Sequence, residues 1–157
     1  MCYSWDTNIS DLVTTREITD VGISAIAHGC PLLSYIDLRN CKKVTDISIS
    51  ALLTSISLSH CFLVTDIGIS ALAGGCPLLS EFDLSSCDKI NDIGISAIAH
   101  GCPLWSYIIF KNCDKITERS ISSLVMHCRF LSVIGFVQLS RAFITDLEND
   151  HPKLRIF

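Results

Sequence analysis

The sequence is poor in charge, in proline and in long apolar runs. Only 18% of its 157 residues are charged and 49% are hydrophobic, which excludes a disordered chain because disorder needs a polar, highly charged composition. Four prolines and eight glycines are too few for a collagen-like or linker-like sequence. No apolar run reaches the roughly 18 residues that a membrane-spanning helix needs. We therefore expect a globular domain with a buried core.

Basic residues show no surplus either, since the formal net charge is −4. Nucleic acids and anionic membranes attract basic surfaces, so we expect neither as a partner. The first residues lack the basic and apolar regions of a secretory signal. We expect an intracellular protein, cytoplasmic or nuclear, whose nine cysteines are reduced thiols.

A repeat of 26 residues organises the chain. The segment 18–43 (ITDVGISAIAHGCPLLSYIDLRNCKK) recurs closely at 64–89 and 90–115, more loosely at 116–143, and six residues short at 44–63. Residues 1–17 align as a degenerate N-terminal half repeat, and 144–157 align as a C-terminal partial repeat. An array of this period predicts a solenoid, in which each unit buries its apolar face against its neighbours.

The five units carry the pattern L-x-x-L-x-L-x-x-C, for example Leu33, Ile36, Leu38 and Cys41, with Leu139 in place of the cysteine in the fifth. This is the leucine-rich-repeat signature, and five consecutive copies make it a strong signal. The alternation around Ile36 predicts a short strand, and the apolar spacing after a Thr-Asp pair predicts a helix. The predicted fold class is α/β, a right-handed horseshoe arc with parallel strands on the concave side and helices on the convex side.

The string HGCPLLSYIDLRNCKKVTD resembles the cysteine-containing leucine-rich-repeat subfamily, which occurs in F-box proteins. The resemblance implies recognition of a protein, commonly a substrate delivered to a cullin-type (SCF) ubiquitin ligase. The F-box of that family is a separate helical module ahead of the repeats. The 17 residues before Ile18 look like half a repeat, so we do not expect ligase docking through an F-box.

Eight of the nine cysteines fall on two repeat positions. We expect them to be small buried core residues rather than redox or metal groups: Cys30, Cys76, Cys102 and Cys128 near helix ends, and Cys41, Cys61, Cys87 and Cys113 after the strands. No C-x₂₋₄-C pair suggests zinc. His28 and His100 lie near predicted helix C-termini, where a cation suits the helix dipole, so we predict surface caps, no metal and no cofactor.

Catalytic groups do not gather in the sequence. Serines such as Ser24, Ser70 and Ser96 recur at one repeat position, which is typical of a polar helix surface rather than of a single activated nucleophile. We therefore predict that the protein is not an enzyme.

The candidate binding residues are those that vary on the concave face. Tyrosine and apolar side chains are common in protein interfaces, so we expect a protein partner there, of unknown identity, with ubiquitin-ligase components or substrates as candidates. The predicted residues are Tyr35, Asp37, Arg39, Glu81, Asp83, Tyr107, Ile109 and Lys111.

The short second repeat predicts a shortened or distorted helix and a dent on the convex side. Leu53 would have to serve both the helix and the entry to the strand. The alternative interpretation is a truncated array with a structural or competitor role and no ligase docking of its own.

Overall fold

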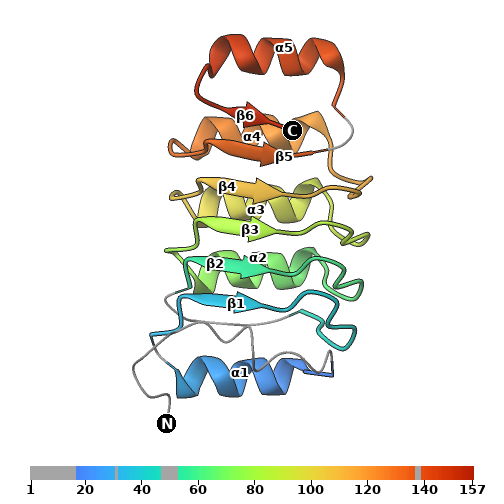
Figure 1. The fold of residues 1–157 in the computed structure, drawn as a ribbon, viewed down its shortest axis with the longest axis vertical. Helices are drawn as coiled ribbons and strands as arrows, with labels where there is room; N and C mark the ends of the chain where they lie inside the picture. Colours follow the sequence, from blue (N-terminus) through green and yellow to red (C-terminus); the bar gives the residue numbers. More distant parts are fainter. Residues whose placement is uncertain (1–16, 31, 47–52, 137–138) are drawn as a thin grey trace.

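A computed structural model describes residues 17–30, 32–46, 53–136 and 139–157. In these ranges strands and helices alternate along the chain (Figure 1). The helices are α1 (Asp20–Gly29), α2 (Asp66–Gly75), α3 (Asp92–Gly101), α4 (Glu118–His127) and α5 (Arg141–Asp150). The strands are β1 (Tyr35–Asp37), β2 (Ser55–Ser57), β3 (Glu81–Asp83), β4 (Tyr107–Ile109), β5 (Val133–Gly135) and β6 (Arg155–Ile156).

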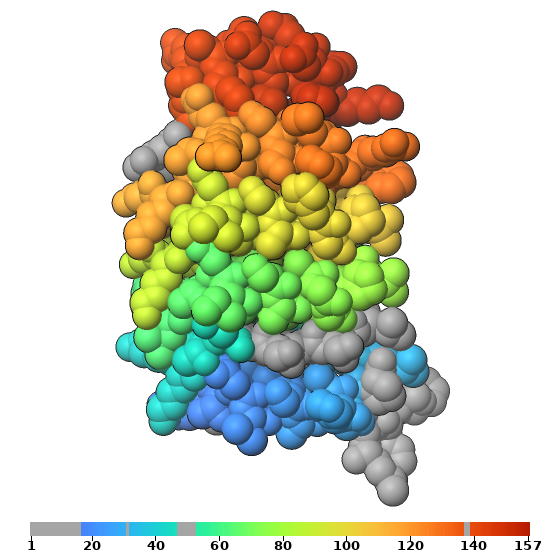
Figure 2. Space-filling view, turned by 180° about the vertical axis from the view of Figure 1, so that it is seen from behind, coloured from blue at the N-terminus to red at the C-terminus, as the bar shows by residue number. Residues whose placement is uncertain are grey.

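The six strands form one parallel sheet in chain order, β1 to β6. The sheet lies on one side of the molecule and the helices lie on the other (Figure 1). Seen from the helix side, successive repeats form successive layers (Figure 2). This arrangement confirms the predicted leucine-rich-repeat solenoid, because parallel neighbours joined by helical crossovers place all helices on one face.

Between the sheet and the helices lies one continuous apolar core. The central residue of each strand from β1 to β5 is buried, as alternation around Ile36 and its equivalents predicts. Leu53 is buried ahead of β2 and serves the strand entry. Phe82 and Trp105 stack in this core with ring centroids 5.5 Å apart. The predicted helix of the short repeat lies at 47–52, outside the described residues.

An acidic residue in the first turn of each helix from α1 to α4 links one repeat to the next. The Asp66 carboxylate accepts hydrogen bonds from the backbone N–H groups of Asn91 (3.0 Å) and Gly94 (3.1 Å). Asp92 accepts from Thr117 in the same way, at 2.8 Å. The carboxylates therefore satisfy free amides at the N-terminus of the following helix, where negative charge is favoured.

Glycines near these N-termini bring a helix close to an aspartate of the preceding repeat. A Cβ on Gly68 would lie 2.8 Å from the Asp46 Cα, and one on Gly94 would lie 2.5 Å from an Asp66 carboxylate oxygen. Such approaches leave no room for a side chain. Small residues at this position therefore set the distance between neighbouring helices.

The end of the array departs from this pattern at α5. Gly68 and Gly94 each lie three residues after the N-cap residue of their helix. Phe143 holds the same position in α5. Its ring is partly buried against the core, and α5 stands away from α4 (Figure 1). The predicted boundary at residue 144 falls inside α5, which begins three residues earlier because Ser140 caps it.

Candidate protein-binding face

The outward side chains of the strands form ordered rows on the concave face. One row, set by the strand register, runs Tyr35, Ser55, Glu81, Tyr107, Val133 and Arg155. The next row runs Asp37, Ser57, Asp83, Ile109 and Gly135. The structure therefore brings the predicted residues of three different repeats onto one surface, since parallel neighbours lie about 4.8 Å apart.

The two serines of β2 make a hollow in this surface. Ser55 and Ser57 are small, whereas their neighbours in the rows are tyrosines and carboxylates. The resulting cavity is about 210 Å³ and is lined by the two serines, Ile56, Tyr35, Arg39, Glu81, Phe82, Asp83, Tyr107 and Ile109. Six of the eight predicted binding residues thus line one hollow. The predicted binding residues did not include Ser55 and Ser57, which form the floor of the hollow. The alignment of the repeats does place both serines on the concave face.

Charge at the hollow is predominantly negative. Arg39 is held by Asp37 through paired hydrogen bonds, with Nη2 2.6 Å from one carboxylate oxygen. Burial raises the pKa of the Asp37 carboxyl, but its hydrogen bonds from Arg39 outweigh burial and leave the pKa lowered. Glu81 is exposed and Asp83 is half-buried, and neither forms an ion pair with a described residue. Among the described residues that line the hollow, the one basic group, Arg39, is therefore already neutralised.

The two tyrosines of the hollow have raised pKa values. Burial raises the pKa of the Tyr107 hydroxyl, and the charges of Asp83 and Glu81 raise it further. Burial also raises the pKa of Tyr35, with a second contribution from Asp37. Both phenols stay protonated at neutral pH and can donate hydrogen bonds.

Lys111 lies outside the hollow. Its ammonium nitrogen is 4.5 Å from the centre of the Phe157 ring, a cation–π contact with the C-terminal residue. Further toward the C-terminus the face becomes apolar, with Val133 half-buried and Gly135 buried. The concave face is therefore apolar at β5.

Seven of the eight repeat cysteines are buried, and none of these seven is disulfide-bonded. In the turns after β2 and β4, the thiol donates to a carbonyl of the preceding repeat: Cys61 to Leu38 at 3.0 Å, and Cys113 to Leu84 at 3.1 Å. Burial raises the pKa of Cys61 to about 12 and that of Cys113 to about 11. Thiols with such pKa values are inert at neutral pH.

Cys30 departs from this pattern. It is only partly buried and it is disulfide-bonded. The expectation that every repeat cysteine is a reduced thiol is therefore wrong at this position.

Three histidines cap the C-terminal ends of their own helices. The Nδ1 atoms of His28, His100 and His127 lie 2.7–2.8 Å from the carbonyl oxygen four residues earlier, near the helix C-terminus. In the part of the chain that the structure describes, no group of three or more His, Cys, Asp or Glu residues is placed to hold a metal. No helix among those residues is long and apolar enough to cross a bilayer.

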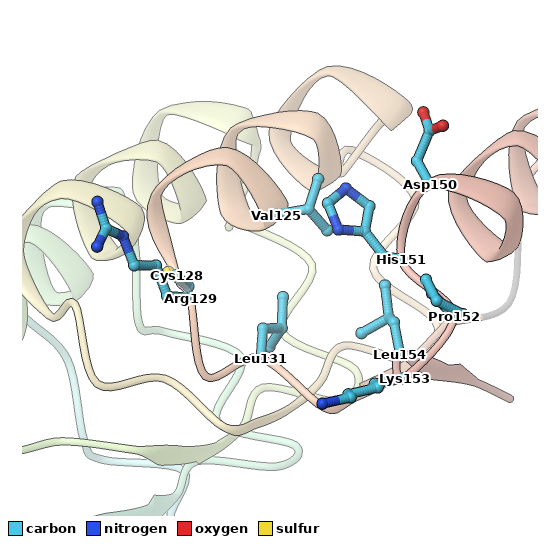
Figure 3. A pocket seen from close by; sticks show the side chains of 9 residues that line it. All are labelled: Val125, Cys128, Arg129, Leu131, Asp150, His151, Pro152, Lys153 and Leu154. Atoms are coloured by element: carbon cyan, nitrogen blue, oxygen red, sulfur yellow. The ribbon is translucent and has the colours of Figure 1, made fainter.

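A larger cavity, about 440 Å³, lies where α5 stands away from α4 (Figure 3). Val125, Leu131 and Leu154 form its apolar wall, and His151 projects into it. His151 stands where Cys76 and Cys102 end the earlier helices. Asp150 points away from the cavity, so its polar groups do not converge on one point (Figure 3). The repeat pattern of the sequence gives no indication of this cavity.

Comparison with known proteins supports the repeat assignment. A family profile described as "Leucine Rich repeat" matches residues 50–73 and 75–99. A comparison with curated proteins finds no match. Among solved structures, a chain of the yeast Rad7 and Elc1 complex is similar, with a TM-score of 0.60 and 18% identity.

That likeness covers 77% of this chain but 32% of the yeast chain, and it shows the fold alone. The cysteine-containing subtype rests on the sequence motif. Residues 50–99 carry leucine-rich repeats, and the fold is a leucine-rich-repeat solenoid.

Proposed function

We propose that this chain is a non-catalytic module that recognises a protein partner on the concave face of β1 to β4. The observation that carries the proposal is the hollow on β2, where tyrosines and unpaired carboxylates from different repeats meet on one open surface. The inward positions of the repeats are alike because they pack the core. The outward positions differ, as a recognition surface requires.

The absence of catalysis is part of this proposal. Recurring helix serines bond within their own helix: the Ser70 hydroxyl donates to the Asp66 carbonyl at 2.7 Å, and Ser122 donates to that of Glu118 at 3.0 Å. A nucleophilic serine would instead need a base within hydrogen-bond reach. This bonding supports the interpretation of these serines as helix-surface residues.

We further propose an intracellular role associated with ubiquitin ligases. Its support is the resemblance of the C-P-x-L and L-x-L-x-x-C motifs to those of F-box leucine-rich-repeat proteins. A second support is the shared fold with a chain from the Rad7 and Elc1 complex, a structure in which the solenoid occurs in a protein assembly.

Affinity capture with the full chain tests both parts. We expect a specific partner to bind the unaltered protein and to bind the double variant Tyr35→Ala, Tyr107→Ala at least about ten-fold less tightly, because interface tyrosines contribute about 2 kcal/mol or more. Recovery of cullin-type ligase components would support the ligase association, and their absence from specific captures would contradict it.

A convex variant is the matched control. Ile67 and Ile93 are 72% and 69% exposed on α2 and α3, so Ile67→Ala with Ile93→Ala removes apolar surface without touching the core. We expect this variant to bind the partner unchanged. Loss of binding in the convex variant, with the tyrosine variant unaffected, would place the interface on the helices and overturn the proposal.

A further inference from the structure

We propose that the hollow on β2 receives a cationic side chain, that of a lysine or an arginine, from the protein partner. This inference rests on the proposed function and specifies its chemistry. It follows from three independent features of the hollow: its shape, its charge and a buried hydroxyl without a partner.

The shape and size of the hollow suit one long side chain. Ser55 and Ser57 form the floor, while Tyr35 on β1 and Tyr107 on β4 lie in the same row on either side of Glu81. A cavity of about 210 Å³ is too small for a helix or a strand but large enough for an extended lysine or arginine side chain. The tyrosine rings lie at the wall, where their faces can contact a cation or its aliphatic stem.

The charge selects a cation over an anion or an apolar group. Asp37 is neutralised by Arg39, which leaves Glu81 and Asp83 without an ion pair among the described residues. Asp83 accepts one hydrogen bond, from the backbone N–H of Ser85 at 2.9 Å, and has further acceptor capacity. A carboxylate ligand would be repelled here, and an apolar ligand would desolvate two charges without compensation.

The hydroxyl of Ser57 provides the third feature. Ser57 is only 8% exposed, and its oxygen has no hydrogen-bond partner in the described structure. Buried polar atoms are nearly always paired, so an unpaired one in the floor of a cavity marks a place for a ligand atom. Because Ser57 lies between Asp37 and Asp83 in the row, an N–H donor placed there can reach its hydroxyl and the Asp83 carboxylate.

Short peptides with one variable residue provide the test on the full chain. The probes are blocked pentapeptides, Gly-Gly-X-Gly-Gly, with X as lysine, arginine or glutamine, titrated into isotope-labelled protein and followed by amide NMR shifts. We expect the lysine or arginine probe, or both, to shift the amides of Ser57 and Asp83 saturably and to bind at least about ten-fold more tightly than the glutamine probe. Comparing the lysine and arginine probes shows which cation is preferred.

Charge variants then locate the site. Asp83→Asn with Glu81→Gln keeps side-chain size while removing both charges, and we expect it to abolish the difference between the cationic probes and glutamine. Asp88→Asn is the control, because Asp88 is an exposed acid in the turn after β3, away from the rows of the concave face. Equal binding of all three probes, or a charge preference that survives the double variant, would overturn the inference.

Ser57→Ala distinguishes a ligand contact from a structural role. Removing an unpaired buried hydroxyl should leave the melting temperature unchanged or higher, yet weaken the cationic probes several-fold. A lower melting temperature with unchanged probe affinity would contradict the role given to Ser57. If the captured partner depends on Tyr35 and Tyr107 but not on the two carboxylates, the proposed function stands and this inference fails.

Discussion

At the scale of single residues, the cysteines show how the repeat uses a small polarisable side chain. In the turn after β2 the thiol of Cys61 is fully buried and donates to the Leu38 carbonyl one repeat earlier. It fills the position that asparagine fills in other leucine-rich repeats, with less polar surface to satisfy. The residues before Cys41 and Cys61 adopt a left-handed backbone, with φ of 62° at Asn40 and 60° at His60. Asparagine and histidine are among the residues that tolerate that conformation.

The reactivity of the thiols follows from this burial. In a Cys2→Ser, Cys30→Ser variant, only the seven buried cysteines remain. A raised pKa keeps a thiol protonated, so we expect native thiols to react slowly with a disulfide reagent from pH 7 to pH 9, where Cys61, Cys102 and Cys113 carry almost no thiolate. Unfolded in urea, all seven should react rapidly above about pH 8.5. A buried thiol that reacts as fast in the native protein as in urea would contradict this account.

At the scale of elements, the contact between consecutive helices depends on the size of the residue three positions after the helix cap. Glycine at this position of α2 and α3 lets each helix approach an aspartate of the preceding repeat, and that aspartate in turn binds the approaching amides. The serine of α4 still fits, since Ser120 is fully buried. In α5 this position holds Phe143, and a cavity lies between the C-terminal ends of α4 and α5.

Two glycines of α2 offer a matched test of this packing. A Cβ on Gly68 would meet backbone at 2.8 Å, whereas one on Gly74 would meet nothing within 4 Å. We expect Gly68→Ala to lower the free energy of unfolding by about 1–3 kcal/mol through overpacking. Gly74→Ala should raise it by up to about 1 kcal/mol through helix propensity. Urea unfolding followed by the fluorescence of the buried Trp105 measures both, and equal effects would show that the close approach does not limit stability.

At the scale of the whole molecule, the extensive contacts between described elements join neighbouring repeats. Stability in such a solenoid is the sum of repeat and interface contributions, so an end repeat with a weak interface opens first. The α5 helix has one buried residue, Leu147, whereas α2 has four. The described structure therefore predicts a stable middle and a less stable C-terminal end.

Hydrogen exchange measures this gradient. We expect Leu147→Ala to remove amide protection in α5 while the amides of β2 to β4 stay protected, because the change is confined to an end repeat. Leu72→Ala in α2 removes a core side chain from the middle and should cost about 2–5 kcal/mol, with protection lost in the neighbouring repeats as well. Loss of protection throughout the chain in the Leu147 variant would instead indicate one fully cooperative unit.

Much of this architecture was predictable because the repeats of one chain can be aligned with one another. Ile36 and Phe82 share a position in the period, so the strands, their inward faces and the concave row could be assigned without coordinates. The period also placed the acidic residues at helix starts. It could not show that Asp66 bonds to Asn91, since that contact depends on how far one helix lies from the next.

The sequence alone determined the solenoid, its parallel sheet and the choice of concave residues, because these follow from short-range periodicity that every unit repeats. Which of those residues meet depends on the tertiary structure. The hollow exists because the register places the two serines of β2 between larger side chains on β1 and β3. The unpaired Ser57 hydroxyl and the pairing of Arg39 with Asp37 are likewise consequences of distance and burial, which a pattern of residue types does not contain.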